Sequence, residues 1–298
     1  MKKLDLTIKD SCISFVVAYL LSQLLIVLFV LTGSVFFEIF GKNYNILNTF
    51  LKTAFGYLIL TAILNISLVL TFLFFNKNKE NKIIEKVNIK KISLYIAIGL
   101  ISYILLYPAI SLIDILLTNI GLPVQNLPYE LNSTNYLISI FSLVIFPAVC
   151  EELIFRGIIF KGLKKYGKVF SIVVSALMFA IFHMSVRQFI YPLIMGSLLA
   201  VIMYYENNII YCIIVHLLNN FTTLTLSYLG INLIWINPLY IAMAIIFIVL
   251  FISLLLYFVF KHKNNYEKTK TTSVDKKSII LSFSLMIIFY VINFISVF

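Results

Sequence analysis

The sequence predicts an all-α integral membrane protein, a polytopic bundle of about nine transmembrane helices. Of its 298 residues, 62% are hydrophobic and only 12% are charged, whereas soluble domains are about half apolar and a quarter charged. The apolar residues also form runs long enough to cross a hydrocarbon core of ~30 Å. We therefore expect lipid, rather than water, to surround most of this chain.

Each expected helix is an apolar run of about 17–25 residues. The first run follows the basic N-terminus and Asp10 and is too long for the core of a signal peptide, so we expect it to be retained. The eighth run is expected to start at Asn237 and Pro238, because these residues suit a helix N-cap and first turn. In chain order the nine expected helices lie at 12–37, 50–75, 92–116, 136–160, 169–186, 188–204, 209–229, 238–260 and 278–297.

The lysines predict the orientation of these helices, because short cytoplasmic loops are enriched in Lys and Arg. With a cytoplasmic N-terminus, nine helices place the lysine-rich connections 76–91, 161–168 and 261–277 inside. The connection 117–135, on the opposite side, contains neither Lys nor Arg. We therefore expect the N-terminus to be cytoplasmic and the C-terminus to be outside.

The composition argues against nucleic-acid binding and against a cysteine-based disulfide or metal site. The net charge of +11 comes from lysines in the short connections, so membrane topology explains it without nucleic acid. Cys12, Cys150 and Cys212 are scattered singly in apolar runs and cannot form a disulfide framework or a CxxC metal site.

Abundant Ile, Asn and Lys, with only two arginines among 23 basic residues, indicate an AT-rich genome, so we expect a bacterial cell membrane.

The chain divides into three regions. Residues 1–135 are expected to form about three N-terminal transmembrane helices, 136–229 a catalytic core, and 230–298 about two C-terminal helices. The sequence has no internal repeat. Without repeat symmetry or paired interrupted helices, a small-molecule transporter has no support.

Ionisable residues inside the membrane direct attention to the central region, because burying a charge there costs about 2.5 kcal/mol or more and usually serves a function. Lys52, Asp114 and Glu206 fall near the ends of expected helices, within reach of interfacial water. The remaining candidates are Glu151, Glu152, Arg156, His183 and His216.

Residues four apart share a helix face, so spacing groups these candidates further. Pro147, one turn before Glu151, is expected to kink its helix and free a backbone carbonyl. Three pairs with this spacing face a common interior: Glu152 and Arg156, Phe179 and His183, and His216 and Asn220.

This set of residues suits the hydrolysis of a peptide bond. Two adjacent carboxylates beside one arginine cannot both be comfortably ionised in a low-dielectric site. We expect Glu152 to pair with Arg156 and Glu151 to act as a general base on water. His183 would hold or polarise that water, and His216 with Asn220 would donate hydrogen bonds to the developing oxyanion.

The three motifs carry a resemblance. Glu151 to Gly157 reads EELIFRG, Phe179 to His183 reads FAIFH, and His216 to Asn220 reads HLLNN. These strings resemble the EExxxR, FxxxH and HxxxN motifs of the CPBP (Abi) family of intramembrane metalloprotease-like or glutamic endopeptidases. That family contains type 2 CAAX prenyl proteases and bacterial relatives that process bacteriocins or confer immunity. The resemblance spans roughly residues 136–225.

The resemblance implies an intramembrane hydrolase with a CAAX-protease-type core. Glu151 and His183 would activate water, and His216 with Asn220 would form the oxyanion hole. Glu152, Arg156 and Phe179 would support the site. The implied substrate is a peptide or protein reached from the membrane, lipidated substrates included, and no cofactor is required.

Other interpretations stay open at this level. His183, His216 and a glutamate are suitable zinc ligands, although the HExxH arrangement is absent. Cys150 adjoins Glu151, but its apolar setting disfavours a thiolate, and Ser197 after Gly196 has an otherwise ordinary setting. The ionisable cluster could simply hold helices together, and Asn220 could bridge two helices. The protein could also be a non-enzymatic membrane partner in bacteriocin immunity or regulation.

Overall fold

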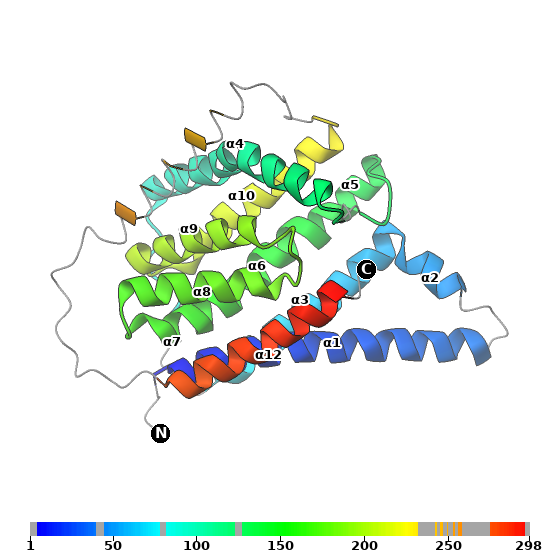
Figure 1. The fold of residues 1–298 in the computed structure, drawn as a ribbon, viewed down its shortest axis with the longest axis horizontal. Helices are drawn as coiled ribbons and strands as arrows, with labels where there is room; N and C mark the ends of the chain where they lie inside the picture. The colour runs from blue at the N-terminus through cyan, green and yellow to red at the C-terminus, as the bar shows by residue number, and fades with distance from the viewer. Residues whose placement is uncertain are drawn as a thin grey trace.

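The computed structural model is a bundle of helices (Figure 1) and describes residues 5–39, 45–77, 82–122, 127–231 and 275–295, with a few isolated residues between 242 and 257. Within these residues the regular secondary structure is helical throughout, without strands. The predicted all-α class is therefore confirmed.

Six helical stretches of the described residues are long and apolar enough to cross a membrane. They are α1 (Ile8–Ile39), α3 (Ala54–Asn76), α4 (Ile89–Asn119), the composite helix Ser133–Lys164, α10 (Ile209–Tyr228) and the Lys276–Asn293 part of α12 (Lys276–Ile295). Two shorter apolar helices, α8 (Lys168–Phe182) and α9 (Ile190–Glu206), and the short α2 (Asn45–Leu51) complete this part of the fold. Eight of the nine predicted helices therefore have counterparts, while almost all of 238–260 lies outside the described residues.

The fifth helix is shorter than predicted. The apolar run suggests a helix to residue 186, but α8 ends at Phe182, with His183 as its C-cap and Met184 in the left-handed region at φ 50°. At about 1.5 Å per residue, its 15 residues span only about 22 Å. His183 therefore lies at a helix end and not inside a continuous membrane-crossing helix.

The fourth predicted helix is interrupted by two π-helical segments. It runs through α5 (Ser133–Ser139), η1 (Ile140–Ile145), α6 (Phe146–Ile154), η2 (Phe155–Phe160) and α7 (Lys161–Lys164). Pro147 stands in the first turn of α6, directly after η1, where its missing N–H interrupts the α-helical hydrogen bonds. π-Helical turns inside α-helices often occur at functional sites, and these two flank the segment with both candidate glutamates.

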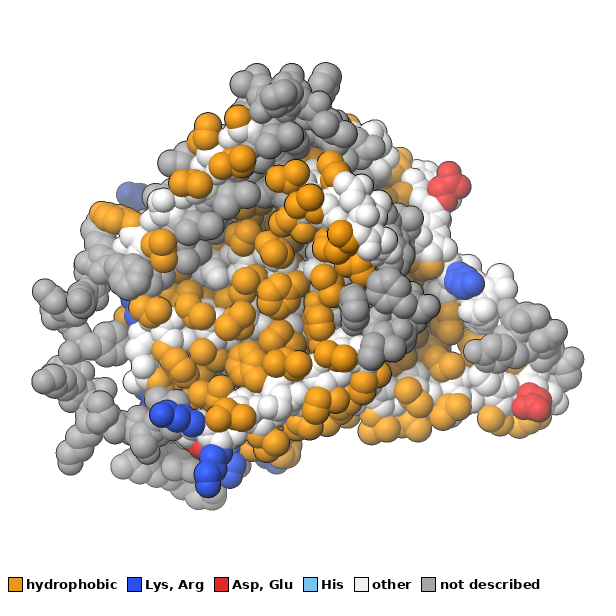
Figure 2. Space-filling view, in the orientation of Figure 1, with side chains coloured by type: hydrophobic (Ala, Val, Ile, Leu, Met, Phe, Trp, Pro, Cys, Tyr) orange, Lys and Arg blue, Asp and Glu red, His pale blue; other side chains and the backbone are white. Residues whose placement is uncertain are grey.

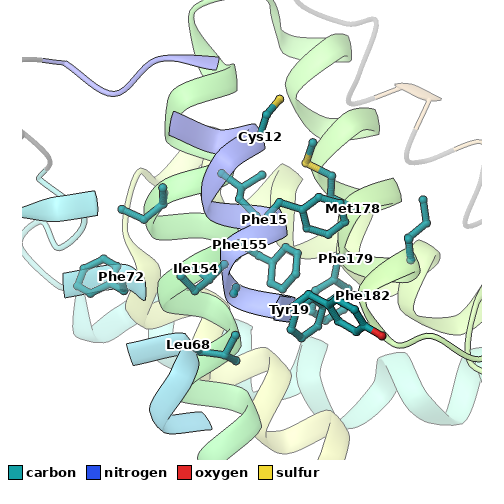
Figure 3. Close-up of a cluster of buried hydrophobic side chains, with 14 of the residues drawn as sticks. Cys12, Phe15, Tyr19, Leu68, Phe72, Ile154, Phe155, Met178, Phe179 and Phe182 are labelled. Carbon is teal, nitrogen blue, oxygen red and sulfur yellow. The ribbon is translucent and has the colours of Figure 1, made fainter. Parts of the chain in front are cut away.

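An aromatic and aliphatic core packs against α6 and η2. Figure 3 shows Phe15 and Tyr19 of α1, Leu68 and Phe72 of α3, and Phe155, Phe179 and Phe182 within this cluster. The Phe155 ring meets Phe179 edge-on at 4.9 Å. The terminal helices α1 and α12 pack together beside this core (Figure 1). The core thereby fixes the segment that carries the candidate site.

The outer surface suits a lipid environment. Large hydrophobic side chains are exposed along α1, α3, α4 and α12, and they cover much of the face in Figure 2. Basic side chains gather at the lower left of that view, near the start of α12. Apolar helix middles and charged helix ends are the arrangement expected of an integral membrane protein, which agrees with the prediction.

Helices α4 and α10 approach closely at Gly99. A Cβ atom at residue 99 would lie 2.8 Å from Leu218 Cβ and 3.0 Å from the Val215 carbonyl oxygen. Because Gly99 has no side chain, α4 packs directly against α10 at Val215 and Leu218, on either side of His216 in the sequence.

We predict that Gly99→Leu lowers the free energy of unfolding by about 1–3 kcal/mol, because the added side chain forces α4 from α10. Thermal unfolding of the purified protein in detergent micelles measures this change. Gly33→Leu is the matched control, since the Cβ there would meet only the flexible end of Leu47, at 3.2 Å. An unchanged midpoint for Gly99→Leu would contradict the close approach.

Candidate active site

Glu152 is the centre of the site. Its Oε1 accepts hydrogen bonds from Arg156 Nη1 at 2.9 Å and from His216 Nδ1 at 2.8 Å. Glu152 is 0% exposed and Arg156 is 2% exposed, so both charges depend on each other for compensation. The ion pair expected from the four-residue spacing is present, whereas local spacing does not predict that His216 shares the same oxygen.

Arg156 also connects the site to α8 and α9. Its Nη2 donates to the Gly196 carbonyl at 3.2 Å, and its guanidinium carbon lies 4.7 Å from the centre of the Phe179 ring. Cation–π contact of this kind stabilises a buried guanidinium. A Cβ at Gly196 would lie only 3.0 Å from the Phe179 ring, so glycine permits this close approach of α9.

Glu151 has a different environment from its neighbour. Its side chain is 12% exposed, and its Oε2 lies 4.0 Å from His216 Nε2. This oxygen is buried and has no hydrogen-bond partner among the described residues. A separation of 4.0 Å is too long for a direct hydrogen bond, but one water can bridge two polar groups across such a gap.

His216 therefore faces both glutamates, one with each ring nitrogen. Nδ1 meets Glu152 and Nε2 points toward Glu151. An ionised Glu152, paired with Arg156, can only accept a hydrogen bond, so Nδ1 then carries the hydrogen. The imidazole is held in place by Glu152 and by the Phe179 ring, whose centre lies 5.9 Å away.

His183 also packs against Phe179. Its ring meets the Phe179 ring at 4.9 Å, and its Nδ1 lies 2.8 Å from the Phe179 carbonyl oxygen. The carbonyl can only accept, so Nδ1 donates, and a neutral ring keeps its lone pair on Nε2. Among the described contacts His183 makes no hydrogen bond to either glutamate, so its role in activating water stays a prediction.

Asn220 lies one turn beyond His216 on α10. Its Nδ2 donates to the Leu143 carbonyl at 3.2 Å. In a regular α-helix this carbonyl would accept from the backbone nitrogen of residue 147, which is proline and has no hydrogen. The carbonyl that Pro147 was predicted to free is thus bound by Asn220, whose place in an oxyanion hole remains a prediction.

Two buried asparagines are not among the residues predicted from the sequence, because an ionisable side chain in an apolar run is the stronger signal. The buried Asn219 side chain lies between Asn220 and the Tyr191 hydroxyl. On α3, Asn65 is buried, and its Oδ1 has no partner among the described residues. The double asparagine after His216 is the local sign of Asn219, and the four-residue spacing points to its second member, Asn220.

The alternative nucleophiles lie apart from this network. Cys150 is a buried free thiol on α6, and the Ser197 hydroxyl donates to the Leu193 carbonyl of its own helix. No group of three His, Cys, Asp or Glu side chains in the described part of the chain is arranged to hold a metal ion. Two of the three ionisable residues expected near the interfaces form ion pairs, Asp114 with Arg187 and Glu206 with Lys91.

The fold and the site define a polytopic membrane protein with a carboxylate, arginine and histidine cluster inside its helix bundle. Residues 133–222 match the family model described as "Type II CAAX prenyl endopeptidase Rce1-like". This range contains all three motifs, and the match confirms the resemblance predicted from them. No curated protein and no solved structure matches the chain. In general terms, the match supports a CAAX-type intramembrane protease.

We predict that Arg156→Met lowers the free energy of unfolding by about 3–5 kcal/mol, because it leaves a buried carboxylate without its cation. Adding Glu152→Leu should recover part of this loss, since the uncompensated charge is then gone. Thermal unfolding in micelles measures both variants. Lys91→Met breaks an exposed ion pair and serves as the control, with a much smaller expected change. Equal effects of Arg156→Met and Lys91→Met would contradict the prediction.

Proposed function

We propose that this protein is an intramembrane endopeptidase in which Glu151 activates water to hydrolyse a peptide bond. His216 and Asn220 stabilise the oxyanion, His183 helps to hold the water, and Glu152 with Arg156 fixes His216. The enzyme needs no metal. It matures or degrades a peptide or a membrane-associated protein, which it receives from the membrane.

The observation that carries this proposal is the unpartnered Glu151 Oε2 beside His216 Nε2. Glu152 also has an unpartnered oxygen, Oε2, but its side chain is 0% exposed. Its other oxygen, Oε1, already binds Arg156 and His216. Glu151 is the less buried of the two carboxylates, at 12% exposed, and its Oε2 is not committed to a hydrogen bond among the described residues. A general base needs both properties, because it must reach water and accept its proton.

The charges of the site support this division of roles. Arg156 forms an ion pair with Glu152, so the cation of the site is committed to Glu152 and Glu151 is left as the base. For His216 to donate to the oxyanion from Nε2 while Nδ1 donates to Glu152, the ring must carry a hydrogen on both nitrogens. Donors aimed at an oxyanion in a water-poor site are among the strongest contributions to catalysis.

The reaction follows from these positions. Glu151 takes a proton from water as the water oxygen bonds to the peptide carbon. The carbonyl oxygen becomes an oxyanion and accepts hydrogen bonds from His216 and Asn220. When the carbon–nitrogen bond breaks, the proton on Glu151 passes to the leaving amine. His183 can accept a hydrogen bond from the same water through Nε2.

We predict that Glu151→Gln lowers the peptide cleavage rate of the purified protein by about 100-fold or more, because the amide cannot accept the proton. A membrane-peptide library, analysed by mass spectrometry, provides the assay and includes prenylated and unprenylated members. Glu206→Gln is the matched control, because Glu206 pairs with Lys91 away from the cluster. Both variants should unfold at temperatures close to that of the wild type.

Full activity of Glu151→Gln would overturn the proposal. The same variant separates catalysis from a binding role in immunity or regulation. If the cellular phenotype survives Glu151→Gln, that phenotype does not depend on proteolysis.

We predict that EDTA and 1,10-phenanthroline leave cleavage unchanged, because the mechanism uses only protein side chains and water. The assay measures peptide cleavage before and after chelation, followed by zinc addition. A zinc-dependent peptidase of known sensitivity, treated in parallel, shows that the chelators work. Loss of activity that zinc restores would overturn the metal-independent mechanism.

A further inference from the structure

A chain of polar side chains lies behind Asn220. The Tyr191 hydroxyl, at the start of α9, is hydrogen-bonded to Asn219 Oδ1 on α10. Asn219 Nδ2 lies 3.4 Å from Asn220 Oδ1, and Asn220 Nδ2 lies 3.2 Å from the Leu143 carbonyl oxygen. The chain therefore runs from α9 through α10 to η1.

The Leu143 carbonyl fixes the direction of every bond in this chain. A carbonyl only accepts, so Asn220 must turn its NH₂ toward Leu143 and its Oδ1 toward Asn219. Asn219 must then present its NH₂ to Asn220 and its Oδ1 to Tyr191. The Tyr191 hydroxyl is left as the donor. One acceptor thus determines the orientation of two amides that could otherwise flip.

Burial makes the chain sensitive to the loss of any member. Asn219 is 2% exposed, and the Tyr191 ring packs edge-on against Tyr103 at 6.2 Å. Water cannot readily replace a lost hydroxyl there, so Asn219 Oδ1 would remain unpaired or its amide would flip. A flipped Asn219 would present an oxygen to the oxygen of Asn220.

We propose that Tyr191 and Asn219 are positioning residues that hold the Asn220 amide in its working orientation. One hydrogen of Asn220 Nδ2 donates to Leu143, and the second makes no other hydrogen bond among the described residues. That second hydrogen is the donor to the oxyanion. This inference rests on the proposed function and adds Tyr191, which lies outside the three motifs, and Asn219, an unspecified position within the third.

The first test is Tyr191→Phe, which removes the hydroxyl and keeps the ring. We expect kcat to fall about 10-fold with KM within about twofold, because a misaligned oxyanion donor affects the transition state alone and costs less than its complete loss. Tyr136→Phe is the matched control: it also removes a tyrosine hydroxyl bonded to α10, at Thr225, 3.0 Å away. Its kcat should stay at the wild-type value.

The decisive test is a double-mutant cycle with Asn220→Ala, measured under single-turnover conditions with excess enzyme. If Tyr191 acts through Asn220, Tyr191→Phe causes no further loss once Asn220 is alanine. Asn219→Leu should behave in the same way and provides a second variant if Tyr191→Phe folds poorly. Equal losses in both backgrounds, or no loss from either variant, would overturn the inference.

Glu151→Gln, assayed in parallel, separates this inference from the proposed function. An inactive Glu151→Gln together with independent effects of Tyr191 and Asn220 overturns the positioning role alone. A fully active Glu151→Gln overturns the proposed function, and the positioning role falls with it.

Discussion

The shared oxygen of Glu152 is the interaction on which the site depends. It binds Arg156 and His216 at hydrogen-bond distance within the helix bundle, and Arg156 extends the network to the Gly196 carbonyl and the Phe179 ring. Four elements, η2, α8, α9 and α10, therefore meet at the one helix that carries both glutamates. Because lipid offers no compensating hydrogen bonds, each of these polar groups needs a partner inside the protein.

This arrangement explains why two adjacent glutamates can serve one histidine. Neighbouring residues on an α-helix point about 100° apart, so they cannot both approach the same atom. Imidazole has two nitrogens that face different directions, and His216 uses Nδ1 for Glu152 and Nε2 for Glu151. The buried glutamate holds the ring, while the more accessible one keeps an oxygen free. Because the two glutamates are adjacent, Glu152 can position His216 while Glu151 remains the candidate base.

The sequence predicted the parts of this structure that depend on composition and local spacing. Long apolar runs predicted the helices, and the four-residue spacing predicted the ion pair of Glu152 and Arg156. The early end of α8 could not be predicted, because the left-handed residue there is Met184 and not glycine. The chain from Tyr191 through Asn219 depends on the packing of α9 against α10, which local spacing does not encode. Pro147 indicated a freed carbonyl, but only the fold shows that Asn220 binds it.

The early end of α8 also explains the four-residue spacing of Phe179 and His183. In a continuing helix the Phe179 carbonyl would accept from the His183 backbone nitrogen, but that N–H turns to the Ala180 carbonyl instead, at 3.3 Å. The His183 side chain then donates from Nδ1 to the Phe179 carbonyl and caps its own helix. That bond fixes the tautomer, so in a neutral ring the lone pair is left on Nε2. The end of α8 therefore also leaves Nε2 of a neutral His183 ring free to accept a hydrogen bond. In a continuous helix the Phe179 carbonyl would be occupied by the backbone, and the histidine tautomer would not be fixed in this way.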